Sequence, residues 1–380
     1  MSNQSEDTKQ NGAVKIISGT TGKPISNSRR RFLSNAGMFS AGLVGSSLLA
    51  ACGDSDFNRA TVQDMDNDPR NAVSDAAVLQ FALNLEYLEA EYYLRAVNDG
   101  MGLQDDDTGG GNMMPGTVIG PRTTSVDFTG DALIGRYAAE IASDELDHVQ
   151  FLRMGLQGAD SLIGRPSINL RASFDGAATA ALRGAGAIDG NTTAQFDPYG
   201  SPLAFLIGAF IFEDVGVSAY KGGARFLSNP DFLEAAAGIL SVEGYHAGLV
   251  RTILTSRAED GATVSFPTMD QDDNAGNTGR IGLYDVITAI SDARDSLDGD
   301  DDLDQGIGDR ESSVDIYGSN VDATNIVPTD DRGITFSRSP AQIHNIAYLT
   351  PNAAQSGGFF PEGTRIPAMP ALSTSGGNTP

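Results

Sequence analysis

The chain has 380 residues, of which 25 are basic and 50 acidic, so its formal net charge at pH 7 is −25. Nucleic-acid binding requires a basic surface, and this balance argues against it. Tryptophan does not occur and cysteine occurs once, which excludes a disulfide framework within one chain.

The first 52 residues have the pattern of an export signal. Residues 28–33, Ser-Arg-Arg-Arg-Phe-Leu, resemble the twin-arginine consensus. The moderately apolar run over 36–51 is too short to span a bilayer, and it ends in Leu-Ala-Ala-Cys, which resembles a bacterial lipobox. We therefore expect 1–52 to be a twin-arginine lipoprotein signal peptide. Cys52 would be the lipidated first residue of an exported protein anchored in the membrane of the cell envelope. The alternative is a plain cleaved signal with an incidental cysteine.

A polar stretch over 53–73 reads as a flexible tether, and four helices are predicted after it. Their approximate bounds are 74–97, 130–155, 201–227 and 231–256. Two long connections separate them, over 99–129 and 157–201, and the second contains a short helical pattern over 177–187. One long crossover between the second and third helices is a known bundle topology. The sequence therefore predicts an all-α fold with a four-helix bundle over 74–256.

The third predicted helix is the most apolar part of the mature chain, and a membrane span is the competing interpretation. Two adjacent acids, Glu213 and Asp214, stand in its middle. Acidic side chains are costly in lipid. We therefore expect a buried helix of the bundle.

Two of the four helices carry a Glu-x-x-His pair, and residues three apart share one face of a helix. The other two helices carry a single glutamate each, with apolar neighbours at helical spacing. These six residues are Glu86, Glu145, His148, Glu213, Glu243 and His246. Carboxylates on apolar stripes are costly unless cations neutralise them. Glu89, one turn from Glu86, is a further candidate neighbour, whereas Glu91 is predicted to face solvent.

The six residues match the ligand set of a dinuclear carboxylate centre. We predict Glu86, Glu145 and His148 around one divalent metal and Glu213, Glu243 and His246 around the other, with Glu145 and Glu243 as bridges. Iron is the first expectation, although this donor set also accepts manganese or zinc. The alternative is that these residues are surface acids and buried, hydrogen-bonded histidines. The occurrence of both pairs together with two phased glutamates favours the metal centre.

Tyrosines repeat the same spacing in the first and third helices. Tyr93 follows Glu86 by seven residues, and Tyr220 follows Glu213 by seven. The bundle therefore reads as two hairpins of one design, related by an approximate two-fold axis. Tyr93 and Tyr220 are candidates for a redox role or for a hydrogen bond to a ligand carboxylate. Ordinary core packing is the alternative.

Residues 257–380 form an irregular acidic extension, with one helical pattern over 283–297 and apolar islands that we expect to dock against the bundle. His344, in one island, has no ligand spacing and is expected to be structural or at the surface. Part of the extension resembles a calcium loop, with Asp300, Asp302, Asp304 and Glu311 as the candidate ligands. A solvated acidic loop is the preferred interpretation, because Gln305 stands where such a loop needs glycine.

Three blocks of the chain, over 81–93, 141–153 and 243–251, resemble the ferritin-like domain family that includes plant desiccation-related proteins and exported bacterial relatives. The sequences Phe-Ser-Arg-Ser at 336–339 and Gly-Gly-Phe-Phe-Pro at 357–361 resemble its C-terminal signature. The resemblance implies a ferritin-like four-helix bundle, and the complete ligand set favours metal binding over a degenerate bundle.

The predicted centre would react with oxygen or peroxide, either by ferroxidase-type oxidation of Fe(II) or by peroxide removal. The alternative is a non-enzymatic stress or desiccation-related envelope protein whose metal is structural. No cage-forming interface is readable in the sequence, and the oligomeric state is left open.

Overall fold

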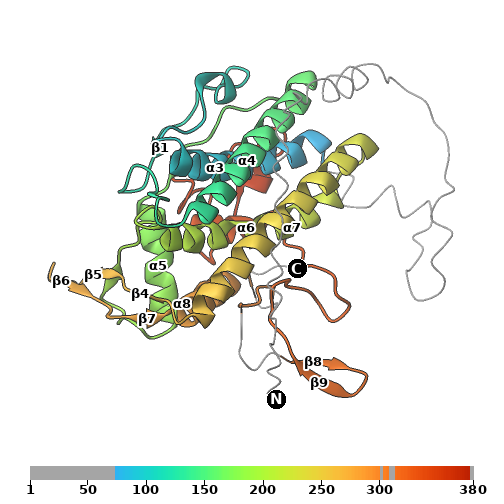
Figure 1. Ribbon diagram of the computed structural model, residues 1–380. Helices are drawn as coiled ribbons and strands as arrows, with labels where there is room; N and C mark the ends of the chain where they lie inside the picture. The colour runs from blue at the N-terminus through green and yellow to red at the C-terminus, as the bar shows by residue number, and fades with distance from the viewer. Residues whose placement is uncertain (1–72, 300–302, 308–312, 377–380) are drawn as a thin grey trace, which may run out of the picture. The chain divides into compact units, whose positions relative to one another are not determined.

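The computed structural model describes residues 73–299, 303–307 and 313–376. The predicted signal peptide with Cys52, and the tether up to residue 72, lie outside the described residues. Four long helices dominate the described chain (Figure 1). They are α3 (Asp75–Val97), α4 (Ala132–Gly158), α6 (Pro202–Ala224) and α7 (Pro230–Glu259). Helix α3 packs along α4, α6 packs along α7, and the two hairpins meet where α3 contacts α6. The predicted all-α bundle with its long second-to-third crossover is confirmed.

Capping residues explain where the helices begin. The side chain of Ser74 accepts a hydrogen bond from the amide of Ala77, and Ser201 does the same for Ala204. Asn229 caps α7 through the amide of Asp231. These side chains satisfy amides that have no partner inside the helix. Proline follows the cap in α6 and α7, where its missing N–H has no cost.

Helix α6 is the only described helix that is long and apolar enough to cross a membrane by length and composition, yet 78% of that stretch is buried inside the fold. Its apolar residues pack against the other helices of the bundle and against the C-terminal residues. A core helix of this kind needs no polar face. This packing agrees with the prediction that the third helix is a buried helix of the bundle.

Both long connections contain short elements of regular structure. These are η2 (Asp105–Asp107) and β1 (Val118–Ile119) in the first, and β2 (Ile168–Asn169), α5 (Ala172–Gly184) and β3 (Thr193–Ala194) in the second. Strands β1 and β2 pair in parallel, so the two connections are joined to each other. Helix α5 begins five residues earlier than the sequence pattern predicts.

The C-terminal extension has more regular structure than its composition predicts. Its elements are β4 (Thr263–Val264), β5 (Pro267–Met269), β6 (Ala275–Asn277), β7 (Ile281–Gly282), α8 (Leu283–Asp298), β8 (Ser313–Ile316), β9 (Ser319–Asp322), α9 (Pro340–Tyr348) and η3 (Pro370–Ser373). All its strand pairs are antiparallel: β3-β5-β6, β4-β7 and β8-β9.

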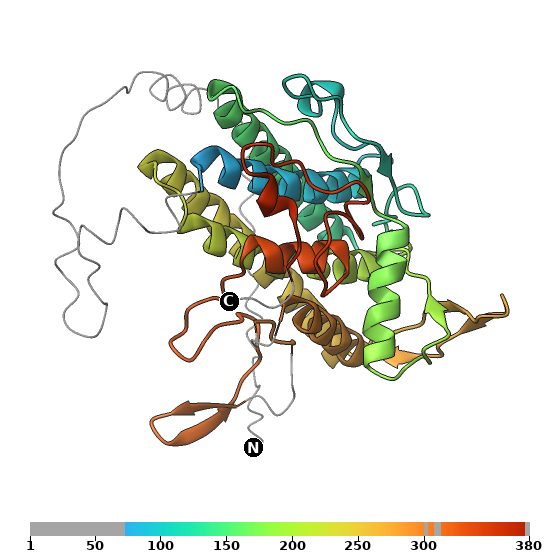
Figure 2. The ribbon, with the colours of Figure 1, turned by 180° about the vertical axis from the view of Figure 1, so that it is seen from behind.

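The last described residues of the extension lie over α3, as Figure 2 shows from behind. The side chain of Asn84 donates to the carbonyl of Arg365 and accepts from its amide. Gln80 accepts from the amide of Ala368. These bonds join residues almost three hundred positions apart, so the extension covers a face of the bundle that would otherwise be open.

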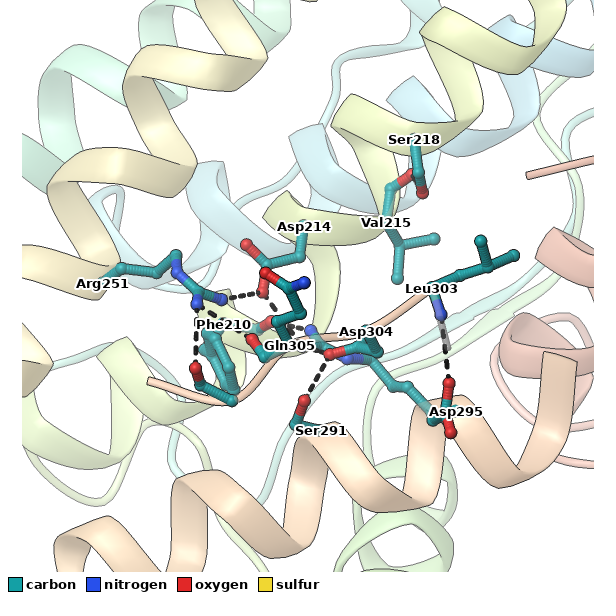
Figure 3. A network of polar contacts seen from close by, with 12 residues as sticks. Phe210, Asp214, Val215, Ser218, Arg251, Ser291, Asp295, Leu303, Asp304 and Gln305 are labelled. Carbon is teal, nitrogen blue, oxygen red and sulfur yellow. Dashed lines mark hydrogen bonds and ion pairs between the residues drawn. The ribbon is translucent and has the colours of Figure 1, made fainter. Parts of the chain in front are cut away.

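A buried network of arginines and aspartates ties the extension to α6 and α7 (Figure 3). Asp214 of α6 accepts from Arg251 at 2.7 Å and from Arg294 at 2.9 Å. Arg294 also reaches Asp304 at 2.7 Å, and Asp304 accepts from Arg338 at 3.0 Å. Arginine forks match carboxylates with two or more hydrogen bonds, which is what allows charges to be buried in this way.

Asp304 agrees neither with the preferred solvated loop nor with the calcium loop, because its side chain is buried in this network. Both of its oxygens accept hydrogen bonds from guanidinium groups, and Ser291 donates to it at 2.6 Å. A carboxylate already neutralised by two arginines has no free oxygen to offer a calcium ion. Asp300, Asp302 and Glu311, the other candidate calcium ligands, lie outside the described residues.

Candidate metal centre

Four of the six predicted ligands meet at one point between three helices. Glu86 comes from α3, Glu145 and His148 from α4, and Glu243 from α7, and one ligand atom of each lies within 4.8 Å of the others. All four residues are buried. Nδ1 of His148 lies 3.2 Å from Glu86, 3.5 Å from Glu145 and 3.8 Å from Glu243.

The remaining two predicted ligands, Glu213 and His246, lie on the other side of Glu145. Nδ1 of His246 is 3.2 Å from Oε1 of Glu145 and 3.6 Å from Oε2 of Glu213. The two imidazole rings are 6.5 Å apart between their centroids. Glu145 therefore faces both histidines, which is the position expected of a bridging carboxylate. Glu243, on the helix of His246, reaches across the cluster to within 3.8 Å of Nδ1 of His148.

The two tyrosines of the repeat contact the glutamates across the bundle. Tyr93 of α3 donates a hydrogen bond to Glu213 of α6, and Tyr220 of α6 donates one to Glu86 of α3. Both tyrosines are buried. Of the roles considered from the sequence, the structure shows the hydrogen bond to the glutamates.

Buried polar atoms without partners provide the test of whether metal ions fit here. Buried polar groups in native proteins are nearly always hydrogen-bonded. Among the described residues seven side-chain atoms of this cluster form ion-pair contacts at most and no well-oriented hydrogen bond: Glu89 Oε2, Glu145 Oε1 and Oε2, Glu213 Oε2, Glu243 Oε1 and Oε2, and His246 Nδ1. Six are carboxylate oxygens and one is an imidazole nitrogen, the donors that iron and manganese accept. The residues fit a group of bound cations.

The carboxylates of the cluster resist ionisation when no cation is bound. Burial raises the pKa of Glu86 to about 7 and that of Glu213 to about 8. Burial, reinforced by the charges of neighbouring carboxylates, also raises the pKa of Glu89 and of Glu243 well above the usual range. Several carboxylates that crowd together without water cannot all be charged at neutral pH.

The pKa values of the two histidines in the cluster are raised, whereas burial alone lowers the pKa of an imidazole. Burial lowers the pKa of His148, but Glu86 and Glu145 outweigh it and raise that pKa to about 11. Glu213 and Glu145 similarly raise the pKa of His246 to about 9. Burial would raise the pKa of Glu145, but its two histidine neighbours lower it below the usual range. In the absence of metal, protons therefore supply the positive charge that the cluster requires.

Two residues near the cluster differ from the expectations or were not singled out. Glu91, predicted to face solvent, is fully buried and forms ion pairs with Arg95 and Arg165. The prediction was wrong because Arg165 comes from the crossover, 74 residues away. Asp144 is not among the residues singled out from the sequence, and its carboxylate lies 3.2 Å from Nε2 of His246. Only its position directly before Glu145 could have indicated this contact.

His344, the third histidine, lies outside the cluster. Its ring is buried, with Nδ1 2.7 Å from the carbonyl oxygen of Pro340 and Nε2 2.8 Å from the hydroxyl of Thr364. Burial lowers its pKa to about 4. A neutral, doubly hydrogen-bonded imidazole has a structural role, as the sequence suggested.

Comparison with known proteins agrees with the bundle and its cluster. A profile described as ferritin-like domain matches residues 74–256. The chain is 26% identical over 335 residues to the ferritin-like catalase Nec2 of Nesocodon mauritianus, covering 87% of this chain and 96% of that protein. It is 29% identical over 191 residues to the desiccation-related protein PCC13-62 of Craterostigma plantagineum, covering 49% of this chain and 55% of that protein. No solved structure matches the chain. Residues 74–256, which carry the four helices and the buried glutamates and histidines, therefore form a ferritin-like domain.

Proposed function

We propose that the protein binds two divalent metal ions, iron or manganese, at this cluster and uses them to remove peroxide. The observation that carries the proposal is the group of buried, unpartnered carboxylate oxygens beside two histidines. Bound cations would neutralise these glutamates at neutral pH in place of the protons that the metal-free cluster holds. The reaction with peroxide is favoured by the relative named a ferritin-like catalase, which aligns over nearly its whole length.

The residues that would hold the ions are Glu86, Glu145, His148, Glu213, Glu243 and His246. Such ions supply the redox couple and the open coordination positions that peroxide chemistry needs. The chain supplies the rest. Glu145 faces both histidines, and Tyr93 and Tyr220 fix the orientation of Glu213 and Glu86. Helices buried around the cluster exclude bulk water, which strengthens every electrostatic interaction inside it.

Metal content is the first test. Elemental analysis of natively matured protein should give two ions per chain, and both should be lost together from Glu145→Ala and from His246→Ala. Glu140→Ala is the matched control, because Glu140 lies on the same helix as Glu145 but is exposed. Full metal content in both site variants would defeat the proposal. Oxygen release from peroxide, compared with Fe(II) oxidation, then distinguishes peroxide removal from a ferroxidase-type reaction.

A second candidate function is favoured by the relative named a desiccation-related protein. In this case the bundle is a non-enzymatic stress protein and its metal is structural. Metal-loaded protein would then show no turnover with peroxide or with Fe(II), while chelation would still lower the melting temperature. Turnover that is lost with the metal would exclude this candidate.

We further propose that the protein is exported by the twin-arginine route and is anchored in the envelope membrane through lipidated Cys52. The support is the sequence over 28–33 and the Leu-Ala-Ala-Cys sequence that ends at Cys52. Cys52→Ser should move the exported protein from the membrane fraction to the soluble fraction. Replacement of Arg29 and Arg30 by lysine should retain it inside the cell. An unchanged distribution in both variants would contradict the proposal.

A further inference from the structure

One buried glutamate breaks the two-fold repeat of the bundle. In the repeat Glu86 corresponds to Glu213, and Tyr93 corresponds to Tyr220. The residue three positions after Glu86 is Glu89, and the residue three positions after Glu213 is Gly216. A carboxylate in one hairpin therefore stands where the other hairpin has no side chain.

Gly216 leaves the space that this extra carboxylate uses. A Cβ atom at Gly216 would lie 2.3 Å from Oε2 of Glu243 and 3.4 Å from Oε1 of Glu89. The first distance is too short for any side chain, so Glu243 could not keep its place beside a larger residue. Glycine inside a helix costs about 0.5–1 kcal/mol relative to alanine. Glycine is needed at position 216 in spite of this cost, because the carboxylates of Glu243 and Glu89 approach α6 closely there.

Glu89 has no cation of its own among the described residues. Its side chain is 5% exposed, and Oε2 has no hydrogen-bond partner. On its other side is a small cavity whose other lining residues are apolar and belong to α3, α6, α9 and Phe359. Glu91, two positions further, is paired with two arginines instead. Glu89 therefore lies between an apolar cavity and the carboxylate of Glu243, at the edge of the metal cluster.

We propose that Glu89 is a seventh protein ligand of the dinuclear centre and that it makes the two metal positions unequal. The proposal rests on the proposed metal centre and adds to it the source of its asymmetry. Five carboxylates carry one more negative charge than two divalent cations neutralise. The additional ligand therefore strengthens binding at the metal position nearer to Glu89, and no equivalent residue strengthens the other position.

Titration of metal-free protein with Mn²⁺ alone tests the proposal. The wild type should bind two ions. Glu89→Gln keeps the shape of the side chain and removes its charge. It should lower the affinity for one of the two ions roughly 10–100-fold, as loss of a supporting group at a metal site does. Gly216→Ala should weaken binding in the same range by displacing Glu243. Gly223→Ala is the matched control on the same helix, because its Cβ would meet Val78 at an ordinary 3.6 Å, and it should leave both ions unaffected.

The outcomes separate the inference from the proposed function. If Glu89→Gln binds both ions as tightly as the wild type, the inference is overturned while the metal centre stands. If the wild type binds no metal, the proposed function itself fails. The melting temperature of the metal-free Glu89→Gln protein should equal or exceed that of the wild type, because a buried carboxyl group without a partner at Oε2 has been replaced by a neutral amide of the same shape. A lower melting temperature with unchanged metal binding would assign Glu89 a structural role and overturn the inference.

Discussion

The hydroxyl of Tyr93 on α3 donates a hydrogen bond to Oε1 of Glu213 on α6. The hydroxyl of Tyr220 on α6 donates the corresponding hydrogen bond to Oε1 of Glu86 on α3. Each hairpin of the bundle thus orients a glutamate of the other, so the two halves of the site depend on each other. The two-fold repeat of the sequence is therefore also present in the site, as two corresponding tyrosine–glutamate hydrogen bonds.

Replacement of Tyr93 by phenylalanine should weaken metal binding. The variant keeps the ring in the core but leaves Glu213 free to turn away from its ion, so we expect a loss of affinity of roughly 10–100-fold. Tyr92→Phe is the matched control. Tyr92 is equally buried and donates at 2.7 Å to the carbonyl of Phe205, away from the cluster. Each variant should lose about 0.5–1.5 kcal/mol of stability. Equal metal affinity in the two variants would contradict the role of Tyr93.

The metal-free protein should become less stable as the pH rises above about 4.5. The folded pKa values of Glu86 and Glu213, about 7 and 8, exceed the ordinary value of 4.5. Those of His148 and His246, about 11 and 9, exceed 6.5. The folded state therefore binds more protons than the unfolded state throughout this range. Stability falls with pH wherever that is so.

Thermal unfolding of chelated protein at pH 6 and pH 9 measures this effect, and the melting temperature should be several degrees lower at pH 9. Metal ions replace the bound protons, so metal affinity should rise over the same range. Metal-loaded protein should accordingly keep its melting temperature at pH 9. A melting temperature of the chelated protein that increases from pH 6 to pH 9 would show that the glutamates are already ionised without metal.

Much of the site could be predicted because it depends on helical periodicity. Residues three and seven apart share a face whatever surrounds them, so Glu145 and His148, or Glu86 and Tyr93, could be paired from the sequence alone. Their apolar neighbours indicated burial. The bundle topology followed in the same way, from four periodic segments and one long connection.

The rest depends on contacts between segments far apart in the chain. Glu91 is buried because Arg165 arrives from the crossover, and Asp304 is neutralised by Arg338. Neither partner stands at a spacing that periodicity can detect. Glu89 could be named as a neighbour of the site, but its relation to Gly216 depends on the packing of α3 against α6. The contact of Asp144 depends on how the ring of His246 is turned.

Replacement of Arg338 by alanine should destabilise the protein strongly. Arg338 is 2% exposed and binds Asp298, Asp304 and Ser218, so its removal leaves buried carboxylates without a partner. Breaking a buried pair in this way costs about 3–5 kcal/mol. Arg332→Ala is the control, because its pair with Asp330 is at the surface and should contribute little to stability. Denaturant unfolding measures both, and equal effects would contradict a stabilising role for the buried network.

Replacement of Asp144 by asparagine should weaken metal binding without unfolding the protein. Asp144 lies 3.2 Å from Nε2 of His246, while Nδ1 of that ring faces Glu145 and Glu213. A carboxylate behind a metal-binding histidine fixes the ring and increases its basicity, and its loss costs roughly 10–100-fold in metal affinity. The side chain of Asp144 is 42% exposed, so the fold should tolerate the change. Glu140→Gln, one turn earlier and exposed, is the control for charge alone. Mn²⁺ affinity that falls equally in both variants would mean that Asp144 acts only through the general field of the acidic surface and does not orient His246.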